Sequence, residues 1–277
     1  MRLLERSIET LHAYYELGNE RTRVGRAVLV ANSTCPDVYD ANCVTRITAE
    51  TGADIDRLLD EVDAAYSAVT HRCFKVEPLT PAPFAARLAL EGYQPNVELQ
   101  SVLETGLGIT APAVDIRPVT DDEDWLSLAK LIRLDHLESA RKRSIECWPQ
   151  RVTEQMVEQK KLKAPGVQFF LARLDGRDSA FFSSWPGING VGKVEDLFTL
   201  PSCRHRGLAT ALIAHAVADA RRRGGEAVLI GADVNDTPKS MYYRLGFRPL
   251  LLYSSHTKIF PPESAGSGRH TRERTDT

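Results

Sequence analysis

The chain has 277 residues, 43% of them hydrophobic and 26% charged, with a formal net charge of −2 from 35 basic and 37 acidic side chains. This length exceeds that of a usual single domain, and the near-neutral charge gives no reason to expect nucleic acid or an anionic membrane as a partner. The sequence offers no apolar run near the roughly 20 residues of a membrane span, no signal-peptide core and no close pairs among its five cysteines, so we expect a cytoplasmic protein without disulfides or a metal site.

Residues 1–104 alternate between helical and extended patterns. Leu4, Ile8, Leu11 and Tyr15 recur at helical spacing and predict a helix over residues 3–17. Further helices are predicted over 54–69 and 81–93, and strands over 26–32, 42–48, 73–79 and 97–103. These elements predict an α/β N-terminal domain.

Residues 105–112 consist mainly of small residues and include two glycines, which predicts a linker. A second α/β domain is predicted over 113–260, and the Ser-, Gly-, Arg- and Thr-rich tail over 261–277 is predicted to be disordered. Within the second domain we expect helices over 121–138, 148–162, 207–223 and 238–246, and strands over 115–119, 167–176, 178–185, 193–200, 227–234 and 250–260.

Two segments, PFAARLALEGY ending at Tyr93 and PKSMYYRLGF ending at Phe247, echo one another. Both run from a helix through glycine and an aromatic residue into a strand. Either the first half is a degenerate copy of the second, or glycine is simply common at such joints. Leu88 stands where Tyr242 would align, and the first half has no glycine-led basic turn, so we expect no anion-binding helix N-terminus there.

The most informative stretch leads through Gly207 into the long helix over 207–223. The unpaired N–H groups and the positive dipole at a helix N-terminus make an anion site. Gly207 permits close approach of a phosphate, Ala209 keeps the first turn clear, and Arg204 and Arg206 add positive charge. This turn predicts a pyrophosphate site.

The residues Arg204-His205-Arg206-Gly207-Leu208-Ala209 are similar to the R/Q-x-x-G-x-G/A acetyl-CoA motif of the GNAT superfamily. The later run from Asn235 to Phe247 resembles that family's N-x-x-A-x-x-L-Y-x-K-L-G-F signature, with Pro238 in place of the usual alanine. The resemblance covers about residues 113–260. It implies a mixed, centrally splayed sheet flanked by helices, and N-acetyltransferase activity with acetyl-CoA as co-substrate.

The resemblance also implies roles for individual residues. The backbone of Leu197, Phe198 and Thr199 would pair with the pantetheine arm, and Asn235 would cap the next helix or bond the same arm. Tyr242 would protonate the departing thiolate, and it is also expected to contact coenzyme A. The pyrophosphate would lie on residues Arg204, His205, Arg206, Gly207, Leu208, Ala209 and Thr210.

An alkyl ammonium has a pKa near ~10.4, so a base or a water chain must deprotonate the acceptor. Strand alternation predicts that only one of Glu195 and Asp196 points into the cleft, and Glu195 fits the family's acidic position better. His136, Glu138 and Arg141 lie where such proteins often shape acceptor selectivity.

The acceptor is expected to be a primary amine of a small molecule or a peptide, attacked without a covalent enzyme intermediate. The sequence does not identify this amine or the length of the acyl chain on the donor. It also does not decide whether the protein forms a homodimer. Two alternatives also remain open: a non-catalytic acyl-CoA-binding module, and an acyl-tRNA-dependent transferase of the same fold, which would need a basic surface.

Overall fold

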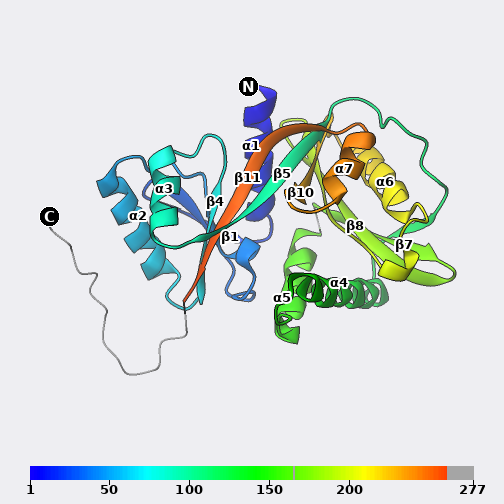
Figure 1. Ribbon diagram of the computed structural model, residues 1–277, viewed down its shortest axis with the longest axis horizontal. Coiled ribbons are helices and arrows are strands. Elements are labelled where there is room, and N and C mark those ends of the chain that lie inside the picture. The colour runs from blue at the N-terminus through cyan, green and yellow to red at the C-terminus, as the bar shows by residue number, and fades with distance from the viewer. Residues whose placement is uncertain (165, 261–277) are drawn as a thin grey trace.

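A computed structural model describes residues 1–164 and 166–260; the predicted disordered tail over 261–277 lies outside this description. The described strands form one mixed, 11-stranded sheet in the order β1-β2-β3-β4-β11-β5-β10-β9-β8-β7-β6, with helices packed against it (Figure 1). The strands are β1 Glu20–Val24, β2 Ala27–Ala31, β3 Cys43–Thr45, β4 His71–Val76, β5 Gln94–Leu103, β6 Asp115–Pro118, β7 Gln168–Leu174, β8 Arg177–Ile188, β9 Val191–Thr199, β10 Ala227–Asp233 and β11 Arg248–Ile259. The α-helices are α1 Leu3–Glu16, α2 Gly52–Ala65, α3 Ala82–Leu90, α4 Asp122–Arg143, α5 Gln150–Lys163, α6 Leu208–Arg222 and α7 Pro238–Arg244.

The last strands of the two halves exchange partners at the centre of the sheet. β5, from the first half, lies between β10 and β11, and β11, from the second half, lies between β4 and β5. Leu103 of β5 pairs with Val228 of β10, and Ser254 of β11 pairs with Val76 of β4. In Figure 1 the two long strands run side by side through the middle of the molecule. The two halves are therefore joined by reciprocal strand exchange.

Each half also contains a parallel strand pair followed by the same type of helix-to-strand joint. β3 pairs with β4 in the first half and β9 pairs with β10 in the second, both in parallel. After α3, the Tyr93 N–H donates to the Leu88 carbonyl (3.0 Å), and after α7 the Phe247 N–H donates to the Tyr242 carbonyl (3.1 Å). The same type of bond also ends α4, from the Ile145 N–H to the Ala140 carbonyl (3.0 Å), and α6, from the Gly225 N–H to the Ala220 carbonyl (2.9 Å). The joint is therefore a common helix ending and does not by itself distinguish a degenerate second copy.

The hydrophobic core crosses the junction between the halves. Leu103 of β5 is buried in the cluster formed by α6, β8 and β10 of the second half. Leu11 and Tyr15 of α1 pack with Leu229 of β10 and Tyr253 of β11. Because both halves contribute to these clusters, neither one buries its apolar surface alone.

Most predicted elements agree with the structure to within a few residues. The strand β1 was missed because its sequence, ERTRV, is largely exposed and lacks apolar alternation. The strand predicted over 42–48 ends at Thr45, since Arg46 adopts a φ of 53°. The first helix of the second half runs on to Arg143 and ends at Ser144, which has left-handed backbone angles.

Leu103→Ala tests the strand exchange. The side chain is fully buried in the core of the second half, so its truncation is expected to lower the free energy of unfolding by about 2–5 kcal/mol. Trp125, Trp148 and Trp185 all lie in the second half, so tryptophan fluorescence follows that half during denaturant unfolding. The exposed Leu90→Ala is the matched control, with an expected change within about 0.5 kcal/mol. A fluorescence midpoint unaffected by Leu103→Ala would contradict the exchange.

Candidate functional site

The parallel pair β9–β10 opens partway along its length. Val191–Val194 pair with Ala227–Ile230, and beyond them β9 continues beside β8 while β10 continues beside β5. A bulge accompanies this opening: the register with β8 shifts between Glu195 and Phe198, and Asp196 has a φ of 67°. The sheet is therefore splayed at its centre, as the resemblance predicted.

The N-terminus of α6 faces outward without a side-chain cap. Gly207 precedes the helix with a φ of 83°, and His205 is also left-handed, with a φ of 61°. Among the described residues, no acceptor is found for the backbone amides of Leu208, Ala209 and Thr210. Alternating left-handed residues and free amides at a helix N-terminus form a concave anion-binding surface.

The two arginines of this turn are engaged by carboxylates. The Arg204 guanidinium donates to both carboxylate oxygens of Glu138 (2.8 and 2.6 Å) and to the Thr199 carbonyl (3.0 Å). Arg206 forms an exposed ion pair with Asp175 (2.8 Å), and because water screens such a surface pair it contributes little to stability. Arg206 can therefore exchange its partner for a phosphate, whereas Arg204 holds α4 against the turn.

Tyr242 lies on α7 and is 4% exposed, at a cleft of about 350 Å³ beside the opening of the two strands. Burial, together with the carboxylate of Asp236, raises the pKa of the phenol well above its usual value, so the phenol carries its proton at neutral pH. Tyr243 points elsewhere and is 57% exposed. The cleft is lined by Glu98, Ile132, Asp135, His136, Ser139, Met156, Lys160, Phe181, Glu195, Asp196, Leu197, Gly231, Ala232, Asp233, Asp236, Pro238 and Tyr242.

The expectation that only one of Glu195 and Asp196 faces the cleft is wrong, because both line it. The left-handed residue at the bulge interrupts the alternation on which that expectation depended. Each carboxylate has a lysine partner: Glu195 pairs with Lys193, and Asp196 pairs with Lys160 (2.6 Å).

Asn235 is exposed in the turn before α7 and does not cap that helix. The N-cap position belongs to Thr237, and the Asn235 N–H donates to the Asp233 carboxylate (2.8 Å). The capping role expected for Asn235 is therefore wrong. Of the pantetheine segment, Leu197 lines the cleft, Phe198 is buried, and the buried Thr199 hydroxyl lacks a hydrogen-bond partner.

Sequence reasoning placed only His136, Glu138 and Arg141 of this region near the acceptor, whereas the structure shows that one face of α4 lines the cleft. Ile132, Asp135, His136 and Ser139 follow the i, i+3, i+4, i+7 spacing of one helical face, and this spacing was the available signal. Burial and nearby cations lower the pKa of His136 to about 4, so its ring is neutral at pH 7. Glu138 binds Arg204 instead of lining the cleft.

The first half contributes to the same cleft. Glu98 of β5 lines it directly, and its carboxylate accepts a hydrogen bond from Gln100 (2.9 Å). The loop before β3 also contacts α5. The Asp37 N–H donates to the Gln155 side-chain oxygen (2.8 Å), and the Gln155 side-chain NH₂ donates to the Asp37 carboxylate (3.0 Å).

No helix within residues 1–164 and 166–260 is both long and apolar enough to span a membrane.

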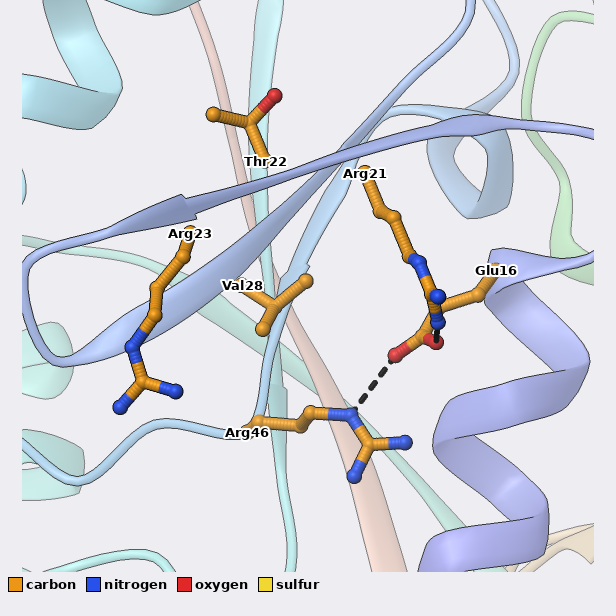
Figure 2. Close-up of a pocket in the computed structure, with 6 residues that line it drawn as sticks. All are labelled: Glu16, Arg21, Thr22, Arg23, Val28 and Arg46. Atoms are coloured by element: carbon orange, nitrogen blue, oxygen red, sulfur yellow. Dashed lines mark hydrogen bonds and ion pairs between the residues drawn. The ribbon is translucent and has the colours of Figure 1, made fainter.

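A second hollow, of about 240 Å³, lies on the first half beside β1 and β2. Figure 2 shows Arg21 and Arg46 pointing toward Glu16, whereas Arg23 points away from it. Glu16 pairs with Arg21 (3.1 Å) and with Arg46 (2.8 Å). None of the site residues predicted from the sequence lines this hollow.

The model of the Acetyltransferase (GNAT) family matches residues 131–247. A GCN5-related N-acetyltransferase from Kribbella flavida superposes with a TM-score of 0.66 at 17% identity, covering 92% of this chain and 95% of that chain. A functionally unknown conserved protein from Staphylococcus epidermidis gives a TM-score of 0.65 at 13% identity, covering 88% and 95%.

A tandem GNAT protein from the clavulanic acid biosynthesis pathway gives a TM-score of 0.57 at 14% identity, covering 84% of this chain and 78% of that chain. At these identities the structural likenesses establish the fold alone. No curated protein matches the chain.

Proposed function

We propose, from the match of residues 131–247 to the model of the Acetyltransferase (GNAT) family, that the protein transfers an acetyl group from acetyl-CoA to a primary amine by direct attack. One observation carries the proposal: a buried, protonated phenol, Tyr242, lies at the cleft where β9 and β10 separate. A phenol in this place can protonate the thiolate of coenzyme A as the thioester is cleaved.

The residues present fit the donor. The gap between β9 and β10 leaves room for the pantetheine arm to pair with the backbone of Leu197, Phe198 and Thr199. The unpartnered Thr199 hydroxyl adds a buried polar group on the same segment. The pyrophosphate would bind the first-turn amides of α6, with Arg206 released from its exposed pair to add charge.

The lining of the cleft favours a cationic acceptor. Six carboxylates line it, and among the described residues the cations in ion pairs with them are Lys160, Lys193 and Arg143, so carboxylates outnumber these cations. An alkyl ammonium is therefore attracted and a carboxylate is repelled. The same charge opposes the acyl-tRNA alternative at this site, since a polyphosphate backbone needs a basic surface. The six carboxylates are Glu98, Asp135, Glu195, Asp196, Asp233 and Asp236.

The proposal extends to the domain organisation. Residues 1–104 would be a degenerate copy of the fold that forms a wall of the acceptor cleft through Glu98, while residues 113–260 would bind the donor. At α2, the Thr51 hydroxyl accepts from the Asp54 N–H (3.2 Å), and the Asp54 carboxylate lies in the first turn. A phosphate would be repelled there, so one donor site per chain is proposed.

The test is release of free thiol from acetyl-CoA with butylamine, putrescine, spermidine, lysine and a short peptide as acceptors. We expect turnover with at least one of the cationic amines and an acetylated product of matching mass. Tight acetyl-CoA binding by calorimetry without turnover on any amine would favour the non-catalytic binding module instead. Absence of acetyl-CoA binding would overturn the assignment of the donor site.

A further inference from the structure

Asp135 differs from every other carboxylate in the cleft. It lies on α4, half-buried, on the same helical face as Ile132 and Ser139, which also line the cleft. Within the described residues its side chain makes neither a hydrogen bond nor an ion pair. An unpaired carboxylate facing a cleft is free to accept a proton from a ligand.

The remaining carboxylates of the cleft are already engaged. Glu195 is paired with the buried Lys193, and Asp196 is paired with Lys160. The other three accept hydrogen bonds: Glu98 from the Gln100 amide, Asp233 from the Asn235 N–H and Asp236 from the Thr237 N–H. A cation or an N–H group that holds a carboxylate stabilises its charged form and occupies an oxygen that could otherwise accept a proton from a ligand. Burial also raises the pKa of Glu98, so Asp135 differs from Glu98 by having no hydrogen-bond or ion-pair partner on its carboxylate among the described residues.

The surroundings of Asp135 also disfavour its charged form. Burial and the like charges of Glu138 and Asp196 outweigh the nearby cations Lys142 and Lys160, and raise the pKa of Asp135 to about 6. A general base works best when its pKa lies near the working pH, since it is then ionised and still basic. Asp135 meets both conditions at pH 7.

We propose that Asp135, rather than Glu195 or Asp196, is the general base that deprotonates the acceptor ammonium. The inference rests on the proposed acetyl transfer and deepens it by assigning the proton acceptor. It places the base on α4 and not on the bulged strand β9 that carries Glu195.

The proton balance is complete with the groups present. The acceptor R–NH₃⁺ gives one proton to Asp135, and the neutral nitrogen attacks the thioester carbonyl. The C–N bond forms, the C–S bond breaks, and the leaving thiolate takes the proton of Tyr242. The second nitrogen proton restores the Tyr242 phenol, and Asp135 releases its proton to solvent. The net products are the amide, free coenzyme A and one proton.

The test compares pH profiles of kcat/KM for the full chain with acetyl-CoA and putrescine, or with spermidine if that amine reacts faster. In the wild type, activity is expected to fall tenfold per pH unit below about 6, as Asp135 becomes protonated. Asp135→Asn should lower the plateau by about 10²-fold and abolish this acidic limb. Asp135→Glu should retain a limb at a shifted pH and recover part of the activity.

Asp122→Asn is the matched control, because Asp122 lies on the same helix, is exposed and is absent from the cleft. It should leave both the plateau and the limb unchanged. Acetyl-CoA affinity, measured by calorimetry, should be the same in wild type and Asp135→Asn.

The outcomes separate the two proposals. An active Asp135→Asn enzyme that keeps the acidic limb, or a limb that disappears only in Glu195→Gln, would overturn the role of Asp135 and leave the acetyltransferase proposal intact. A wild type that binds acetyl-CoA but acetylates no amine would overturn both. A carboxyl signal of Asp135 that titrates near pH 4 in NMR spectra would also reject the assignment, without reference to activity.

Discussion

Replacing Tyr242 with phenylalanine is expected to lower kcat by about 10²- to 10⁴-fold while leaving acetyl-CoA affinity within a few-fold of wild type. The phenylalanine ring keeps the packing of a side chain that is 4% exposed, and only the hydroxyl is lost. The leaving thiolate would then lose the proton donor placed beside it and would have to take its proton from water. Steady-state thiol release and calorimetry with the same preparation give both quantities.

Tyr243→Phe is the matched control for this experiment. Tyr243 is the next residue on the same helix, but it is exposed and its ring faces Arg248, so kcat should not change. Equal turnover in Tyr242→Phe and wild type would show that the phenol is not the proton donor. A loss confined to acetyl-CoA binding would instead make Tyr242 a donor-contacting residue.

Gly207→Asp is expected to weaken acetyl-CoA binding by about 10²- to 10³-fold. An aspartate would place a negative charge beside the pyrophosphate, and two unit charges at 4 Å repel by about 4 kcal/mol at an effective dielectric of 20. The new Cβ atom would also come within 2.7 Å of the Pro112 side chain, on a backbone whose φ of 83° suits glycine. Calorimetric titration with acetyl-CoA measures the loss.

Two further variants separate charge from strain. Gly207→Ala adds the Cβ atom without the charge, so its loss of affinity should be the smaller of the two. Gly52→Asp introduces the same aspartate at the start of α2, where nothing lies within 4 Å of an added Cβ atom, and it should leave binding unchanged. Wild-type affinity in a folded Gly207→Asp protein would remove the donor site from the α6 N-terminus.

The sequence predicted the parts of the site that are local along the chain. The turn from Arg204 to Gly207 and the joint from Tyr242 to Phe247 depend on glycines at left-handed positions and on a helix that begins or ends there. Each of these requirements involves residues that are close together in the chain, so each can be recognised as a short motif in the sequence. The same locality explains why the elements of both halves were predicted closely, apart from the polar edge strand β1.

The lysine partner of Asp196 could not be read from the sequence, whereas Lys193 lies two residues before Glu195 on the same strand. Lys160 comes from α5, and the bulge at Asp196 turns a carboxylate that alternation would have sent to the other face. A bulge is a mismatch of register between two strands, so it is defined by pairing and not by either strand alone.

The sequence by itself determined the helix that begins after Gly207, the position of Tyr242 on a short helix and the helix-to-strand joints, because each depends on residues a few positions apart. Only the tertiary structure decided that β5 and β11 exchange places, since adjacent strands in a sheet can come from any part of the chain. That exchange brings Glu98 from the first half to the cleft that Asp135 of α4 and Tyr242 of α7 also line. The charge and burial of a group in this cleft depend on residues from all of these segments. The proposal that Asp135 is the base therefore needed the tertiary structure.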